Sequence, residues 1–243
     1  MINVSLCSAQ SANQISNQYG VLSCYGAAAG LPGGSWSKSC TPTRWVGGWL
    51  AARCGLANGV ISALNTNLCS QNSAVSNLNG RLICNNPLKG LVGGSWFQSC
   101  SPLYWNRRTQ IMVATCGTTV SSFGPFLQPS FINLGLCANG AIVTNSYGLL
   151  VCSAVSPRLP GGSWYQSCSP LTYNTSVPGT MALVATCAGG PKNVLTGMDH
   201  SLCVGSPLTQ INSILICSEI AAGYPGRLTL LYLDLVMWES PLS

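Results

Sequence analysis

Gly33-Gly34-Ser35-Trp36-Ser37-Lys38-Ser39-Cys40-Thr41-Pro42 is a ten-residue stretch that returns twice with little change, at 93–102 and 161–170. A Gly-x-Leu-x-Cys block precedes each copy, and an apolar run that ends in Cys follows each copy. Motifs that recur three times in one order indicate tandem repeats, in which every copy builds the same local structure. We therefore interpret the chain of 243 residues repeat by repeat.

The fourteen cysteines indicate the compartment. Their number is even, no Cys-x-x-Cys occurs and the chain has one histidine, so the ligand spacings of zinc and iron–sulfur sites are absent. Regularly spaced cysteines predict disulfides and an oxidising compartment, which makes the protein secreted or periplasmic. Met1-Ile2-Asn3-Val4 does not resemble the start of a signal peptide, so we interpret the chain as a fragment or a processed product.

Composition excludes two further classes. Charged residues make up 6% of the chain, against about 25% in ordinary soluble domains. Lys and Arg outnumber Asp and Glu ten to four, but Arg107-Arg108 is the one local cluster, whereas nucleic-acid binding needs a basic stripe. No apolar run reaches the eighteen residues or so of a membrane span, so we expect no membrane insertion.

Cysteine spacing predicts hairpins. The third and fourth cysteines of a repeat are 14, 16 or 19 residues apart, and such length changes collect at exposed turn tips. Facing residues of antiparallel strands lie within disulfide reach. The first and second cysteines flank a second hairpin, whose Asn and Gly residues suit a tight turn. The predicted bridges are Cys7–Cys24, Cys40–Cys54, Cys69–Cys84, Cys100–Cys116, Cys137–Cys152, Cys168–Cys187 and Cys203–Cys217.

The predicted fold class is all-β, with short strands between Gly, Pro, Asn and Ser turns and no amphipathic helix. In the final half-repeat, 203–217, Asn212-Ser213 replaces the glycine turn, which predicts a degenerate hairpin. Residues 219–243 contain no cysteine and repeat nothing. They are interpreted as an extra strand, a linker or the start of another unit.

The order Gly-Gly-Ser-Trp-x-x-Ser-Cys, Val-Ala-x-Cys, Leu-Cys and Asn-x-x-Gly-x-Leu-x-Cys in residues 93–152 resembles the cyanovirin-N homology family. The same pattern fits 33–84 and 161–217. The resemblance implies pseudo-symmetric pairs of all-β repeats, a disulfide between the third and fourth cysteines, and binding of carbohydrate, typically mannose-rich glycans. It implies no metal, no cofactor and no catalysis.

The resemblance also implies binding residues. Family pockets lie between the stretch before the third cysteine, the residues after the fourth, and a hairpin turn exchanged from the other repeat. Carried over, one pocket contains Asn77, Leu78, Asn79, Ser95, Gln98, Ser99, Gly117, Thr118 and Thr119; a second contains Asn145, Ser146, Tyr147, Ser163, Gln166, Ser167, Ala188 and Gly189; a third contains Asn17, Gln18, Tyr19, Ser35, Lys38, Ser39 and Gly55.

This chain departs from the family at one place in each pocket. Family pockets often use acidic side chains to accept sugar hydroxyls, whereas Gly55, Gly117 and Ala188 have no such acceptor. The Ser, Asn, Gln and Thr residues also have an ordinary interpretation as turn residues.

The aromatic residues fall into two groups. The tryptophan of the Gly-Gly-Ser-Trp block keeps a fixed distance from a cysteine, which is typical of a core anchor rather than a sugar-stacking residue. The aromatic residues of the variable tips are the better candidates for stacking. The first group is Trp36, Trp96 and Trp164, and the second is Trp45, Tyr104, Trp105 and Tyr173.

Catalysis has little support. Asp199-His200-Ser201 contains the residue types of a catalytic triad, but neighbours on a strand point apart and cannot form a relay. Asp199 is the one acid within the repeats, whereas glycosidases use two carboxylates and calcium sites need several oxygen ligands.

Two domain schemes remain open. In the favoured one, 33–152 closes into a two-repeat domain by exchange of hairpins. The hairpin 1–24 and the repeat 161–217 are left over and can join as a second, incomplete unit, and the tail 219–243 follows. In the other, each hairpin packs with the strands that follow it, in units 1–58, 62–121 and 128–191. Whether hairpins are exchanged within one chain or between chains is also open.

We thus expect a lectin that binds neutral, mannose-rich glycans through shallow hydrogen-bonding sites. The alternative is a structural or adhesive repeat protein whose sugar sites have decayed.

Overall fold

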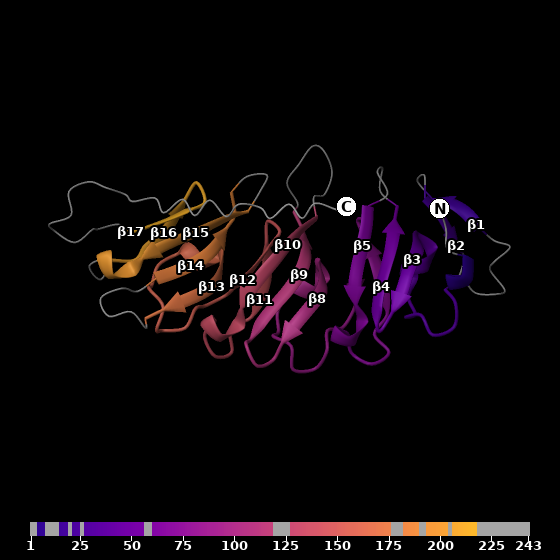
Figure 1. The fold of residues 1–243 in the computed structure, drawn as a ribbon, viewed down its shortest axis with the longest axis horizontal. Coiled ribbons are helices and arrows are strands. Elements are labelled where there is room, and N and C mark those ends of the chain that lie inside the picture. The colour runs from indigo at the N-terminus through magenta and orange to yellow at the C-terminus, as the bar shows by residue number, and fades with distance from the viewer. Residues whose placement is uncertain are drawn as a thin grey trace, which may run out of the picture.

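The computed structural model of the chain describes residues 4–7, 15–18, 21–24, 27–55, 60–118, 127–175, 182–189, 193–203 and 206–217. These residues form an elongated array of small antiparallel sheets, which follow one another in chain order along the longest axis (Figure 1). Among them there is no α-helix. The predicted all-β class of short strands and hairpins is confirmed.

Each repeat contains one three-stranded antiparallel sheet with its middle strand second in the sequence. Side chains alternate along that strand: in the first sheet Leu50, Ala52 and Cys54 are buried, whereas Trp49 and Arg53 are exposed. The third strand of each sheet was not predicted separately. The strands are β3 (Cys40–Val46), β4 (Trp49–Cys54) and β5 (Val60–Asn65), then β8 (Cys100–Asn106), β9 (Ile111–Gly117) and β10 (Leu127–Asn133), then β13 (Cys168–Asn174), β14 (Ala182–Cys187) and β15 (Val194–Asp199).

Two-stranded hairpins alternate with these sheets. They are formed by β1 (Ile15–Gln18) and β2 (Val21–Cys24), β6 (Val75–Leu78) and β7 (Arg81–Cys84), β11 (Val143–Ser146) and β12 (Leu149–Cys152), and β16 (Leu208–Ile211) and β17 (Ile214–Cys217). Short 3-10 helices join the elements: η1 (Val4–Leu6), η2 (Ser35–Lys38), η3 (Thr66–Leu68), η4 (Trp96–Gln98), η5 (Leu134–Leu136), η6 (Trp164–Gln166) and η7 (His200–Leu202).

The three hairpin turns that the structure describes each have two residues with positive φ, which is the conformation that suits a tight antiparallel hairpin. Asn79 and Gly80 have φ values of 49° and 85°, and Tyr147 and Gly148 have 50° and 87°. The final hairpin is also formed, although a degenerate one was predicted. Asn212 and Ser213 adopt φ values of 49° and 70° there, so Ser213 occupies the position of the glycine.

All seven predicted disulfides are present. Cys40 and Cys54 are direct partners across β3 and β4, with Cα atoms 4.0 Å apart, and the equivalent pairs of the next two sheets match them. The hairpin disulfides differ from this arrangement, because Cys84 faces Val75 and its partner Cys69 lies before the hairpin. They therefore tie the preceding loop to the second hairpin strand.

A β-bulge recurs after the Cys-x-Pro segment in all three sheets, between Pro42 and Arg44 and at the equivalent positions. The bulged residue leaves its carbonyl available to another repeat. The side-chain amide of Asn65 donates to the carbonyl of Leu103 at 3.2 Å, and that of Asn133 donates to Leu171 at the same distance. The bulges thus dock consecutive repeats onto each other.

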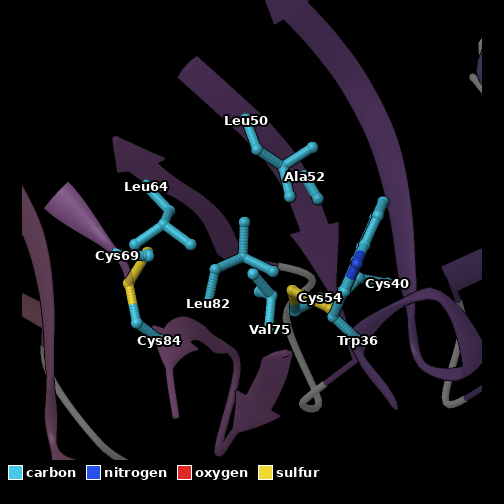
Figure 2. Packing of buried hydrophobic residues seen from close by; sticks show 10 residues of the cluster. All are labelled: Trp36, Cys40, Leu50, Ala52, Cys54, Leu64, Cys69, Val75, Leu82 and Cys84. Atoms are coloured by element: carbon cyan, nitrogen blue, oxygen red, sulfur yellow. A yellow bond between two sulfur atoms is a disulfide. The ribbon is translucent and has the colours of Figure 1, made fainter. Parts of the chain in front are cut away.

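Three buried hydrophobic clusters alternate with these docking contacts, one in each repeat. In the first cluster, Val75 and Leu82 of the hairpin point toward Leu64 of the sheet and lie between the Cys40–Cys54 and Cys69–Cys84 disulfides (Figure 2). Each cluster joins a sheet to the hairpin that follows it in the sequence.

The predicted hairpin exchange is therefore not found among the described residues. Val75 and Leu82 share a core with the sheet that precedes them, and Val143 and Leu150 share the next core with β8–β10. The second strand of a hairpin also contacts the first strand of the next sheet, as β2 does with β3, β7 with β8 and β12 with β13, so packing with the strands that follow is present beside packing with the strands that precede. The physical reason for the missing exchange is the short connection between sheet and hairpin. After β5 the chain passes through the three-residue η3 and returns directly onto the sheet that it has just left.

The Gly-Gly-Ser-Trp block explains this return. Gly93 accepts a hydrogen bond from the backbone of Val143 at 2.8 Å, and Gly94 forms a parallel bridge with the same residue. A Cβ on Gly94 would overlap the Val143 carbonyl, and Gly34 and Gly162 are in the same position against Val75 and Leu208. Only glycine allows two backbones to approach this closely.

The tryptophan of the block is a core anchor in every repeat, as predicted. Trp36, Trp96 and Trp164 have no exposed surface. Each indole N–H donates to a backbone carbonyl four residues earlier, at 2.8–3.0 Å. Burial of an indole requires such a partner, and the Gly-Gly turn provides it.

Several expectations concern residues outside the described ranges. These are Tyr19, Thr119, the side chain of Gln18 and the tail 219–243. No helix within the described part of the chain has the length and apolarity needed to cross a membrane.

We expect Gly94→Ala to lower the free energy of unfolding by about 3 kcal/mol, because the new methyl group overpacks a backbone contact and φ there is 132°. Guanidinium unfolding of the oxidised protein measures this. Gly93→Ala is the matched control, since a Cβ at Gly93 meets nothing within 4 Å. Equal losses in the two variants would contradict the proposed role of the contact.

Candidate functional site

Polar residues from the Gly-Gly-Ser-Trp block, the residue after the fourth cysteine and the hairpin turn come together in each repeat. We call these groups the first, second and third turn surfaces. The first contains Ser35, Lys38, Ser39 and the turn 77–80; the second contains Ser95, Gln98, Ser99, Gly117, Thr118 and the turn 145–148; the third contains Ser163, Gln166, Ser167, Ala188 and the turn 210–213.

The predicted sets combined each hairpin turn with the serine of the following repeat, whereas the structure combines it with the serine of the preceding Gly-Gly-Ser-Trp block. Asn77 was grouped with Ser99 and Asn145 with Ser167, on the assumption of exchanged hairpins. Instead Asn77 donates to Ser39 at 2.8 Å, and Asn145 donates to Ser99 at 2.9 Å. The correction follows from the packing of each hairpin on its own sheet.

The buried parts of the first two turn surfaces are closed hydrogen-bond networks. The amide of Asn145 donates to Ser99 and to the carbonyl of Gly117 at 3.0 Å, while its oxygen accepts from the backbone of Gly148 at 2.9 Å. Asn77 binds Ser39 and Gly80 in the same way. These asparagines thus hold the turn against the sheet, which is the turn-residue interpretation.

The third turn surface reaches a similar network with different residues. Ser167 donates to the side-chain oxygen of Gln210 at 3.2 Å, and the Gln210 amide donates to the carbonyl of Ala188 at 3.1 Å. Ser213 donates to the same carbonyl. The sequence analysis missed Gln210 and Ser213. Alignment of the hairpins places Gln210 at the position of Asn145 and Ser213 at the position of Gly148, and this alignment was the signal that could have found them.

The outer parts of the three turn surfaces remain open to solvent. Each has an exposed serine and, three residues later, an exposed long polar side chain: Ser35 with Lys38, Ser95 with Gln98, and Ser163 with Gln166. The turn tips Asn79 and Tyr147 are exposed, whereas Leu78 and Ser146 are half-buried. The exposed hydroxyls and amides of these residues can donate to and accept from a ligand.

The predicted third set is not assembled as expected. Asn17 is described and exposed, but Ser35, Lys38 and Ser39 lie with the turn 77–80 instead. Gly55 donates its backbone N–H to the carbonyl of Ser39 at 2.9 Å, and Gly117 and Ala188 repeat this contact. The residues at positions 55, 117 and 188 therefore hold the backbone of the serine in place through this hydrogen bond and do not contact a ligand through a side chain.

Arg81 contacts the second turn surface and was missed by the sequence analysis. It belongs to the preceding hairpin, is 4% exposed, and donates to the carbonyl of Ser99. Its guanidinium fills the space where Gly117 has no Cβ. Its Nε and the hydroxyl of buried Thr118 have no partner. Burial lowers the pKa of Arg81 because the charged form loses solvation.

The tip aromatics are less available than predicted. Trp45, Trp105 and Tyr173 pack partly against the three cores, and Arg107 lies over the Trp105 ring at 5.0 Å. Tyr104 is 49% exposed. Trp45 and Tyr173 nevertheless each contribute to the lining of a surface cleft.

Asp199, His200 and Ser201 do not form a relay. Asp199 accepts from the hydroxyl of Ser201 at 2.6 Å and caps η7, while the Nδ1 atom of His200 is buried without a partner. Burial lowers the pKa of His200, and the nearby Asp199 carboxylate offsets part of this effect. Within the described ranges, no three His, Cys, Asp or Glu side chains are placed to hold a metal ion.

No protein-family model matches the chain, and no curated protein matches it significantly.

We expect Arg81→Leu to leave stability unchanged or to raise the free energy of unfolding by about 1 kcal/mol, because a buried cation whose printed partner is the Ser99 carbonyl and not a carboxylate is replaced by an apolar side chain. The equivalent residues of the neighbouring hairpins are the buried Val21 and Leu149. Leu149→Arg is the converse control and should lose roughly 3 kcal/mol, because Ala188 stands there in place of Gly117. Denaturant unfolding measures both, and strong destabilisation by Arg81→Leu would show that the arginine is required for folding.

Proposed function

We propose that this chain is a carbohydrate-binding protein whose repeats are related to those of the cyanovirin-N homology family. The three turn surfaces are its binding sites and neutral, mannose-rich glycans are its ligands. The observation that supports the proposal best is the repetition of an exposed serine and an exposed Lys or Gln beside a fixed hairpin turn. Because the turn is fixed before binding, only the exposed side chains have to be ordered when they meet sugar hydroxyls.

The placement of the sites supports binding to multivalent glycans. The three turn surfaces belong to consecutive repeats of one elongated array (Figure 1). Weak sites held on one chain gain avidity when the ligand presents several copies of the same sugar. The seven disulfides suit the oxidising environment in which such glycans occur, so we place the protein outside the cell or in a periplasm.

A structural or adhesive repeat protein is the second candidate. It is favoured by the networks of Asn77 and Asn145, in which the amide and the oxygen of each side chain both hold the turn. Under this proposal the turn surfaces are structural features, and no neutral oligosaccharide on a glycan array binds.

We expect Gln98→Ala combined with Gln166→Ala to weaken binding to the preferred glycan about tenfold with little change in the melting temperature, because both side chains are exposed and outside the turn networks. Thr172→Ala, at an exposed position in β13, is the matched control and should bind normally. Ser99→Ala should instead lower the melting temperature, since it removes the partner of Asn145. Unchanged binding by the double variant would contradict the assignment of the turn surfaces.

A further inference from the structure

A cleft of about 730 Å³ lies at the junction of the second and third repeats, outside the turn surfaces. Ligand sites for small molecules are typically between roughly 300 and 1,000 Å³, so a sugar unit can fit. Its lining contains segments 135–139 and 156–159 together with Tyr173 and Thr175. None of these residues belongs to the glycan sites proposed above.

The walls of the cleft are held in place before any ligand arrives. Ser156 donates its backbone N–H to the carbonyl of Leu136 at 2.9 Å, and Ala138 donates to Ala154 at 3.0 Å. The Cys137–Cys152 disulfide joins segment 135–139 to the end of β12, four residues before Ser156. The Asn133 amide fixes β13, which contains Tyr173, through its bond to Leu171. A preformed cleft loses little conformational entropy on binding.

The polar groups in the lining suit a sugar ring. Tyr173 provides an aromatic ring, which can pack against sugar C–H groups, and its inner side is supported by the third core. Asn139, Ser156 and Thr175 provide an amide and two hydroxyls. Buried Leu159 supplies apolar surface. An apolar surface with a few polar groups is typical of a small-molecule site.

Arg158 gives this cleft a charge preference. Its side chain is exposed in the lining, and the lining contains no carboxylate to neutralise it. Among the residues that the structure describes, Asp199 is the only acid. A guanidinium forms paired hydrogen bonds with planar anionic groups such as carboxylates, and it also binds sulfates.

The first repeat provides an internal comparison. A second cleft of about 570 Å³ is lined by Trp45, which stands five residues after its cysteine as Tyr173 does. The loop after the preceding hairpin contributes to both clefts, but Gly30 occupies the place of Arg158, and the Trp45 cleft contains no charged residue. The aromatic position and the loop are thus shared, and the cation is particular to the Tyr173 cleft.

We propose that the Tyr173 cleft is a separate binding subsite for a saccharide unit that carries an anionic group, and that Arg158 contacts this group while Tyr173 packs against the ring. The carboxylate of a uronic acid and the sulfate of a sulfated sugar share the required chemistry. This inference does not depend on the turn surfaces, because the two sets of residues do not overlap.

The test uses three ligands that differ only at carbon 6: methyl glucoside, methyl glucuronide and methyl glucoside 6-sulfate. They are titrated into the oxidised protein, and binding is followed by NMR shifts of the Tyr173 ring and of the Asn139 and Thr175 amides. We expect at least one anionic ligand to bind about tenfold more tightly than the glucoside, as a charge-assisted hydrogen bond implies. Comparison of the two anionic ligands identifies the preferred group.

Variants show which residue causes the preference for the anionic ligands over the glucoside. Arg158→Ala should abolish it, because Arg158 is exposed and its loss removes the charge without disturbing the core, whereas Arg158→Lys should keep part of it. The Gln98→Ala, Gln166→Ala double variant should retain it, so failure of the turn surfaces and failure of the cleft give different results. Equal binding of all three ligands, an unaffected Arg158→Ala variant, or anionic-ligand shifts that leave Tyr173, Asn139 and Thr175 unmoved would each overturn the proposal.

Discussion

The contact between the second glycine of each Gly-Gly-Ser-Trp block and the first strand of the next hairpin controls how a repeat closes. Gly94 meets Val143 backbone to backbone, and the same loop places the indole of Trp96 in the core with its N–H on the carbonyl of Val92. The hairpin is therefore fixed to its own sheet, and the two disulfides lie on either side of the core so formed (Figure 2). Because each core is small, this close approach and the cross-links together stabilise it.

Repeats then dock through polar contacts at regular positions. The β-bulges of the second and third sheets each present a carbonyl to an asparagine of the preceding sheet, Leu103 to Asn65 and Leu171 to Asn133. A serine of the docking strand also binds the hairpin backbone, as Ser101 does to Leu82. Arg81 is the exception at these junctions, since it places a cation where the neighbouring repeats have Val21 and Leu149. The array is thus held by small cores, the third of which also packs against Leu136 and Val155 of the second repeat, and by hydrogen bonds between repeats.

The two kinds of proposed site follow from this construction. Each turn surface lies within one repeat, where the hairpin turn returns to the serine before the third cysteine, so it recurs in each of the three repeats. The Tyr173 cleft lies where two repeats meet, and its lining changes with the loop that follows each hairpin. Repetition within the unit suits several equivalent weak sites, whereas variation at the junctions allows one cleft to acquire Arg158 and a different preference.

Sequence alone was enough to determine the all-β class, the seven disulfide pairs, the hairpin turns and the buried tryptophans. These features follow from local spacing, because hairpin partners and turn residues are close in the chain. It also identified the serines and asparagines of the turn surfaces. Tertiary structure decided which turn meets which serine, because Asn145 can reach Ser99 or Ser167 by equally plausible chain paths. Tertiary structure also decided that Arg81 and the Tyr173 cleft lie where two repeats meet. The contact between repeats depends on the carbonyls of the β-bulges and on glycines without a Cβ, and the spacing of residues in the sequence does not reveal these contacts.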